Sequence, residues 1–93
     1  MIQADSRPRL AQKARVKFDK LTDRHMLLYP EGGLQLNPSA AAIVELCSGE
    51  RSVSEVIDAL AERYPGQPRE AIERDTLTLL GALSDRGLVR CDP

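Results

Sequence analysis

Aromatic and metal-binding side chains are scarce in this 93-residue sequence. It has one Phe, two Tyr and no Trp, so Leu, Ile, Val and Ala must fill most of any core. The single histidine is His25, and Cys47 and Cys91 have no spacing typical of a zinc site. We therefore expect no metal site. Cys47 stands in an apolar stretch, where a thiol serves as a small hydrophobic side chain, and a cytosolic location would disfavour a disulfide.

Long hydrophobic runs are also absent. No apolar segment approaches the roughly 20 residues that a membrane-spanning helix requires. The first residues, Met1–Ser6, lack the apolar segment of a signal peptide. The sequence therefore predicts a cytoplasmic protein with no membrane partner.

Patterns typical of catalysis are missing as well. The Gly32-Gly33 pair belongs to neither a GxGxxG nor a Walker motif and indicates a tight turn. The pair Asp5-Ser6 would suit a carrier protein only at the start of a helix, and it stands in an irregular segment. Acidic residues near Glu70 alternate with Arg, as on a solvated helix surface. We predict no catalytic residues and no cofactor, and therefore no enzyme.

Three short strands are predicted in the first third of the chain. Residues 1–12 contain Pro8 and mixed charges, and we expect them to form a flexible, irregular tail. Side chains alternate between small or apolar and polar over Ala14–Asp19, which indicates a half-buried strand. The apolar run His25–Tyr29 and the alternation over Leu34–Leu36 predict two further strands.

The rest of the sequence predicts three helices. The first begins at Asn37-Pro38, because Asn caps free N–H groups and Pro suits the first helical position. The second begins at the S-x-x-E capping box of Ser52–Glu55, and the third begins near Pro68. Their expected ends are Gly49, Pro65 and Gly87. Three strands followed by three helices make an α+β arrangement. We predict that residues 13–93 form a single winged-helix-like domain, with a three-stranded antiparallel sheet followed by three helices.

Basic residues are concentrated at the N-terminal end. Residues 1–24 contain seven Lys or Arg against three Asp, whereas the rest of the chain contains six basic and eleven acidic residues. A winged helix that binds DNA draws its affinity from Lys and Arg on the elements that meet the phosphates. The third predicted helix, residues 69–87, has three Arg against four acidic residues. We therefore predict no nucleic-acid partner and keep a DNA-binding regulator as the alternative function.

The predicted sheet must have an edge. An exposed edge offers unpaired N–H and C=O groups, to which a peptide or a second copy of the chain can add as another strand. The candidate strand follows the Gly32-Gly33 turn and is short, so a strand too short to pair with anything is the other interpretation. A monomer or weak homodimer is the expected oligomeric state.

An ordered set of residues resembles a known family. It includes Arg7-Pro8-Arg9-Leu10, Tyr29-Pro30-Glu31-Gly32 and Gly87-Leu88. Its other members are Leu36-Asn37, Ala42-Ile43, Gly49, Val53, Ile57, Leu60, Tyr64, Asp75, Leu80 and Leu83. None of these motifs is specific alone, but their order and spacing over nearly the whole chain resemble the pyrroloquinoline quinone (PQQ) biosynthesis protein D (PqqD) family.

The resemblance implies a recognition element for ribosomally synthesised and post-translationally modified peptides (a RiPP recognition element). It implies a peptide chaperone that binds the precursor peptide PqqA and presents it to the radical SAM enzyme PqqE, which cross-links a Glu and a Tyr of the peptide. In such domains the leader peptide adds to the third strand and lies against the third helix. The implied peptide-binding residues are Gly33, Leu34, Gln35, Leu36 and Asn37 on the strand, with Ile72, Asp75, Thr76, Leu79 and Leu83 on the helix. Relatives often have a larger aliphatic residue in place of Thr76, so the sequence departs from the family there.

Overall fold

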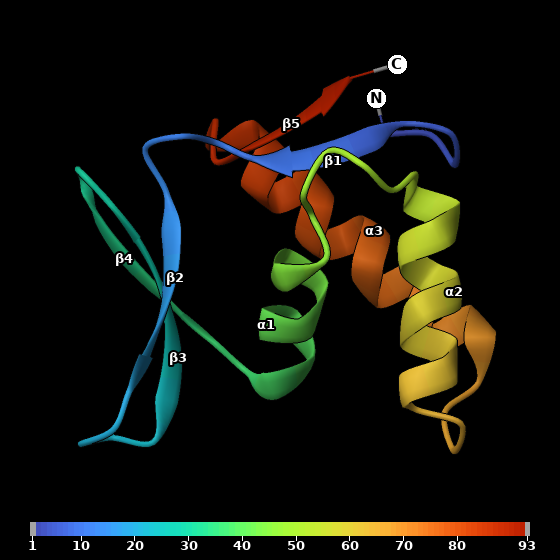
Figure 1. Ribbon diagram of the computed structural model, residues 1–93, viewed down its shortest axis with the longest axis horizontal. Coiled ribbons are helices and arrows are strands. Elements are labelled where there is room, and N and C mark those ends of the chain that lie inside the picture. The colour runs from blue at the N-terminus through green and yellow to red at the C-terminus, as the bar shows by residue number, and fades with distance from the viewer. Residues whose placement is uncertain (1, 93) are drawn as a thin grey trace.

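The computed structural model describes residues 2–92, and the chain forms two small antiparallel sheets and three helices (Figure 1). In chain order the elements are β1 (Arg7–Leu10), β2 (Arg15–Asp19), β3 (Arg24–Tyr29), β4 (Gly32–Leu36), α1 (Pro38–Glu45), α2 (Val53–Arg63), α3 (Arg69–Asp85) and β5 (Val89–Asp92). The predicted α+β, winged-helix-like arrangement of a three-stranded antiparallel sheet followed by three helices is confirmed.

The three-stranded sheet has the order β2-β3-β4, so each strand pairs with its neighbour in the sequence. The turn between β3 and β4 is tight, because Tyr29 lies directly opposite Gly32. Gly32 has a φ of 155°, a conformation that residues with a side chain rarely adopt. The turn between β2 and β3 is longer, and Asp19 Oδ1 accepts a hydrogen bond of 2.9 Å from the Leu21 N–H within it.

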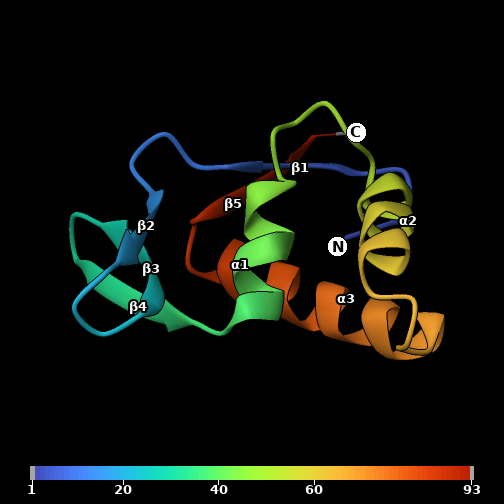
Figure 2. The same cartoon turned by 60° about the horizontal axis from the view of Figure 1, so that its bottom comes forward.

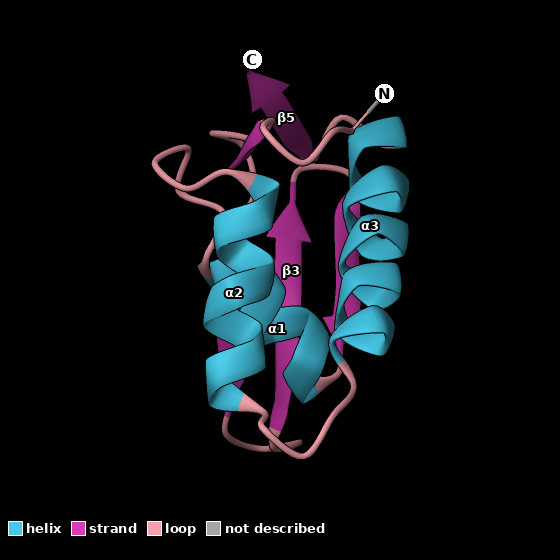
Figure 3. Ribbon diagram, turned by 90° about the vertical axis from the view of Figure 1, so that its right-hand side faces the viewer, coloured by secondary structure: helices cyan, strands magenta, loops and turns pink. Residues whose placement is uncertain are grey.

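The helices cover one face of this sheet. Side chains of a strand alternate between its two faces, and the face with Leu27 and Leu36 packs against the helices. Figure 3 shows β3 behind α1 and α2 when the molecule is viewed from the helix side. The opposite face, named the outer face from here on, carries Arg15, Lys17, Asp19, Arg24, Met26, Leu28, Gly33 and Gln35.

The second sheet pairs β1 with β5 and lies across the ends of the helices (Figure 2). Leu10 lies opposite Val89, and Arg7 lies opposite Asp92. The sequence predicts an extended segment after Gly87 but gives no sign that this segment pairs with the start of the chain.

The expectation of an irregular tail over residues 1–12 is wrong for Arg7–Leu10. Backbone hydrogen bonds attach this segment and Ser6 before it to the loop that precedes α2 and to the start of α2. The Gly49 N–H donates to the Pro8 carbonyl over 2.9 Å, and the Val53 N–H donates to the Ser6 carbonyl over 2.8 Å. Each bond satisfies a polar group that the fold buries or half-buries. The packed unit therefore begins before residue 13.

The predicted starts of α1 and α2 are confirmed, and each is capped by a side-chain hydrogen bond. Asn37 Oδ1 accepts a hydrogen bond of 2.7 Å from the Ala40 N–H at the start of α1. At the start of α2, Ser52 and Glu55 exchange both bonds of a capping box, at 2.9 and 3.1 Å. No side chain caps α3, whose first residue Arg69 follows Pro68.

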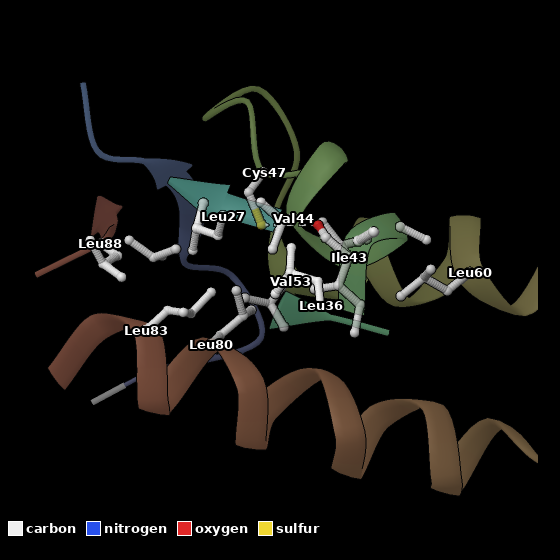
Figure 4. Close-up of a cluster of buried hydrophobic side chains, with 14 of the residues drawn as sticks. Leu27, Leu36, Ile43, Val44, Cys47, Val53, Leu60, Leu80, Leu83 and Leu88 are labelled. Atoms are coloured by element: carbon white, nitrogen blue, oxygen red, sulfur yellow. Dashed lines mark hydrogen bonds between the residues drawn. The ribbon is translucent and has the colours of Figure 1, made fainter. Parts of the chain in front are cut away.

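The core lies between the three-stranded sheet and the three helices (Figure 4). It is aliphatic, as the lack of aromatics requires, and each element contributes to it. Its labelled members in Figure 4 are Leu27, Leu36, Ile43, Val44, Cys47, Val53, Leu60, Leu80, Leu83 and Leu88. Burial of such side chains stabilises the fold by about 1.5–3 kcal/mol for each large one.

Candidate functional site

Strand β4 is an edge strand. Its one neighbour in the sheet is β3, and among residues 2–92 no other segment forms a backbone ladder with it. Its outer N–H and C=O groups are therefore directed away from the rest of the sheet, as strand addition requires. This strand contains Gly33, Leu34, Gln35 and Leu36, the first four residues of the implied peptide-binding set.

The side chains of β4 divide between the two faces of the sheet. Leu34 and Leu36 lie on the face that packs against the helices; Leu36 is buried and Leu34 is half-buried. Gly33 and Gln35 lie on the outer face and are exposed. Gln35 Oε1 accepts a hydrogen bond of 2.8 Å from Arg24 Nη1, which links the edge strand to the start of β3.

A groove runs between α1 and α3, beginning where β4 ends. It has a volume of about 410 Å³, and we name it the α1–α3 groove. Asn37, Ser39, Ala40 and Ile43 line its α1 side. Asp75, Thr78, Leu79 and Ala82 line its α3 side. Asn37 directly follows β4 and lines the groove, so the groove begins where the edge strand ends. Figure 2 shows the chain passing from β4 to the start of α1.

Two of the five implied third-helix residues lie in this groove. Asp75 is exposed and Leu79 is half-buried, and both line the α3 side. The other three, Ile72, Thr76 and Leu83, are at most 5 % exposed and belong to the buried face of α3. The structure thus brings Asn37, Asp75 and Leu79 together and leaves Leu83 in the core.

Sequence reasoning missed half of the α3 side of the groove. Thr78 and Ala82 complete a stripe with Asp75 and Leu79, at the spacing i, i+3, i+4 and i+7 of one helix face. The neighbouring stripe, formed by Ile72, Thr76, Leu80 and Leu83, is the core face. The helical period could have separated the groove stripe from the core stripe. Thr78 is polar and Ala82 is small, so neither residue type indicated a binding surface.

Thr76 lies beside a second, much smaller cavity. This cavity measures about 20 Å³, lies between the three helices, and shares Ser39, Ile43 and Asp75 with the groove. Thr76 is 0 % exposed, and no hydrogen-bond partner is present for its Oγ1 within the described part of the chain. A larger aliphatic side chain at this position would fill the space, so the sequence difference noted above leaves a buried polar atom next to the groove.

Among the residues that the structure describes, the two cysteines and the acidic side chains do not form a metal site or a catalytic group. Within residues 2–92 no three His, Cys, Asp or Glu side chains are close enough to hold a metal ion. Cys47 and Cys91 both keep their thiols, and the Cys47 thiol donates a hydrogen bond of 3.2 Å to the Ile43 carbonyl. Burial, with a smaller contribution from Cys91, raises the pKa of Cys47 to about 12, so this thiol is protonated at neutral pH. Such a thiol is a core side chain rather than a nucleophile.

The described part of the chain holds no helix that is both long and apolar enough to cross a membrane. The exposed edge of β4 and the groove beside it have the geometry that an extended peptide would require.

Relatives from other bacteria match the chain over most of its length. The "PqqA binding protein" of Rhodopseudomonas palustris (strain TIE-1) is 41% identical over 88 residues, which cover 95% of this chain and 85% of the relative. The "PqqA binding protein" of Pseudomonas paraeruginosa (strain DSM 24068 / PA7) is 45% identical over 76 residues, which cover 82% of this chain and 80% of the relative.

Solved structures share the fold. The solution NMR structure of the PqqD truncation of Methylobacterium extorquens PqqCD, described as a functional and stand-alone RiPP recognition element, superposes with a TM-score of 0.81 at 30% identity and covers 97% of this chain and 95% of that one. TbiB1 in complex with the TbiA(beta) leader peptide superposes with a TM-score of 0.72 at 23% identity, over 88% of this chain and 94% of that one, and this likeness shows the fold alone.

The sequence model of one family, described as "Coenzyme PQQ synthesis protein D (PqqD)", matches residues 24–89, which run from the start of β3 into β5. This match covers more than half of the chain and agrees with the similarity to the full-length relatives. The chain therefore belongs to the coenzyme PQQ synthesis protein D (PqqD) family.

Proposed function

We propose that this protein is a non-catalytic peptide chaperone of PQQ biosynthesis. It binds the precursor peptide PqqA as an added strand on β4 and presents it to the radical SAM enzyme PqqE. The observation that carries the proposal is the free edge of β4, which leads directly into the α1–α3 groove. The names of the relatives, "PqqA binding protein", support PqqA as the ligand.

Strand addition gives affinity and selectivity from different parts of this site. Main-chain hydrogen bonds to β4 hold any extended peptide, and side-chain contacts in the groove select among peptides. Leu79 and Ile43 offer apolar contact, whereas Asp75 is the charged residue of the lining and favours a basic or hydrogen-bond-donating side chain. A peptide held in this way is already extended, so part of its ordering entropy is lost before it meets the enzyme.

Presentation also raises the local concentration of the peptide near the enzyme. When one partner holds the peptide and also contacts the enzyme, the second binding event becomes intramolecular, and millimolar effective concentrations are typical of short tethers. No residue of the chaperone has to take part in the chemistry. A cytoplasmic protein that acts as a monomer or weak homodimer suits this role, and both properties belong to the proposal.

The DNA-binding alternative finds no support in the helices. Arg69 forms an ion pair with Asp58, so one of the few cations on α3 is already neutralised by α2. Arg74 lies 3.8 Å from Asp75. Lys and Arg that neutralise phosphates, and so release the counterions condensed on DNA, must not already be paired with carboxylates.

A backbone-amide NMR titration tests the proposal. With the PqqA peptide, we expect the largest shifts at Gly33–Asn37 and around Asp75, Thr78 and Leu79. A parallel titration with duplex DNA should leave these amides unchanged. Absence of any response to the peptide, or shifts confined to the β1–β5 sheet, would show that the edge of β4 is not the binding site.

A further inference from the structure

The outer face of the three-stranded sheet is uncovered. All three helices lie on the other side, where α1 packs against β2, β3 and β4 (Figures 1 and 3). Antiparallel register places Lys17, Met26 and Gln35 in one row across this face, and Arg15, Leu28 and Gly33 in the next. Neither row contributes a side chain to the core or to the lining of the α1–α3 groove.

This face is hollowed beside the β2–β3 turn. The hollow has a volume of about 970 Å³ and an apolar floor, to which Met26 and Leu28 contribute while staying only half-buried. At its rim, Leu21 in the β2–β3 turn is 98% exposed. The exposure of Leu21 is built into the turn, since the Leu21 N–H is bonded to Asp19 Oδ1 and Asp23 has a φ of 57°. A projecting leucine beside a half-buried apolar floor is typical of an interaction site.

The charge of this region is opposite to that of the rest of the chain. Lys17, Lys20 and Arg24 line the hollow together with Asp19, and Arg15 adjoins it on β2. Among side chains that the structure describes, none of these four cations lies within 4 Å of a carboxylate. The whole chain has a net charge of −1, so the remainder of the surface is acidic. A complementary partner surface is therefore acidic, with an apolar residue to enter the hollow and a recess for Leu21.

The shape of the face favours a protein over a lipid bilayer. A peripheral membrane site presents a convex, broadly apolar surface to the headgroups. Here a single leucine projects, and the apolar residues behind it, Met26 and Leu28, line a concave floor. A concave apolar floor with a cationic rim fits side chains of a folded partner.

The hollow also reaches the edge at which the peptide is proposed to bind. Gln35 lines the hollow and belongs to β4, where Arg24 holds its side chain. A strand added to β4 would have alternate side chains on alternate faces: one set toward the α1–α3 groove and the other set on the outer face beside Gln35. A partner docked on the outer face would therefore contact the half of the peptide that the groove does not hold.

We infer that the outer face is the docking surface for an acidic partner protein that receives the peptide, with Leu21 as its apolar anchor and Lys17 and Lys20 as its charged contacts. This inference rests on the proposed addition of the peptide to β4. PqqE, the enzyme of the proposed function, is the partner used to test it. The chaperone thus binds the peptide at the edge of its sheet and the partner on the outer face of the same sheet.

Two variants test the inference without threatening the fold. Leu21→Asp changes a side chain that is almost fully exposed, and Lys17→Glu/Lys20→Glu reverses the charge of the rim. Matched controls on distant surfaces are Leu77→Asp, on the exposed side of α3, and Arg63→Glu/Arg90→Glu. Calorimetry would measure the affinity of each variant for PqqE, with and without the PqqA peptide, and separately the affinity for the peptide alone.

We expect both test variants to bind the enzyme at least tenfold more weakly, while the affinity for the peptide alone stays within twofold of wild type. The controls should change neither affinity. Unchanged enzyme affinity in both test variants, or no complex between the wild-type protein and the enzyme, would overturn the inference. Binding of the wild-type protein to anionic vesicles that Leu21→Asp abolishes, with enzyme affinity unchanged, would overturn it in favour of a membrane. If the PqqA peptide does not bind the isolated wild-type protein, the proposed function is wrong. The inference about the outer face is still tested in that case, because PqqE is also titrated without the peptide.

Discussion

Leu10 and Val89 lie opposite each other in the antiparallel pair of β1 and β5, so the first and last strands of the chain form one sheet. Val89 is buried and Leu10 packs against the core. The N-terminal segment is thus a structural part of the domain. Its carbonyl groups also accept hydrogen bonds from the loop before α2.

Deletion of residues 1–11 should therefore destabilise the protein. The deletion removes β1, exposes Val89 and leaves the Gly49 and Val53 N–H groups without their partners. We expect a loss of about 2 kcal/mol or more in the free energy of unfolding, which corresponds to roughly 10 °C in melting temperature for a domain of this size. Thermal unfolding followed by circular dichroism measures it. Deletion of residues 1–4 alone, as the control, removes the Ala4 carbonyl that accepts from the Ser54 N–H but keeps β1, so it should cost less. Equal melting temperatures for both truncations and the full chain would contradict the expectation.

Leu79→Asp should weaken peptide binding about tenfold or more. The substitution puts a charge into the apolar part of the α1–α3 groove beside Asp75, and a loss of about 1.4 kcal/mol in binding energy is a factor of ten. Leu77→Asp makes the same chemical change on the opposite side of α3 and should leave the affinity unchanged. Fluorescence anisotropy with a labelled PqqA peptide gives both values. Equal losses in the two variants would point to an effect on the helix rather than on the groove.

Thr76→Val should stabilise the fold. The two side chains have similar shapes, and the substitution removes a buried hydroxyl for which no hydrogen-bond partner is present in the described residues. Removal of an unsatisfied buried polar group contributes about 1 kcal/mol, and we expect a rise of roughly 5 °C in melting temperature. Thr78→Val, at an exposed position on the same helix, is the control and should change the melting temperature little. A lower melting temperature for Thr76→Val would mean that the hydroxyl is satisfied in solution.

Cys47 should resist alkylation in the folded protein. Burial raises its pKa to about 12, so at pH 8 the thiol is protonated as well as shielded from solvent. Because the folded-state pKa is the higher one, this contribution to stability is complete below the pKa of the unfolded thiol and is lost as the pH rises toward about 12. Mass spectrometry after iodoacetamide treatment at pH 8 should show Cys47 modified in guanidinium but not in buffer. Rapid modification in buffer would contradict its burial.

The elements with strong local signals could be predicted from the sequence. Asn37 and Ser52 mark the starts of α1 and α2 because each caps its helix through bonds to residues three positions away. The three strands of the meander pair with their sequence neighbours, so alternation and turn residues were sufficient to place them. The position of β4 at the edge follows from that order, and with it the strand half of the candidate site.

Long-range pairing could not be predicted in the same way. Strands β1 and β5 have four residues each, Pro8 interrupts the pattern of the first, and each is an isolated segment until the other is placed beside it. On α3, Leu79 and Leu80 are identical residues with different surroundings: Leu80 is fully buried and Leu79 borders the groove. That distinction depends on where α1 crosses α3, a packing relationship that the residue types alone do not determine.

The pairing of β1 with β5 also has a consequence for protein engineering. It brings Arg7 and Asp92 side by side, so the strands nearest the two ends of the described chain meet in one small sheet, away from the three-stranded sheet (Figure 1). A fusion partner attached after β5 would be tethered beside this small sheet, where it would not block β4. Circular permutation should be tolerated for the same reason: a short linker can join the two ends, and new termini can be opened in a surface loop such as the one between α2 and α3.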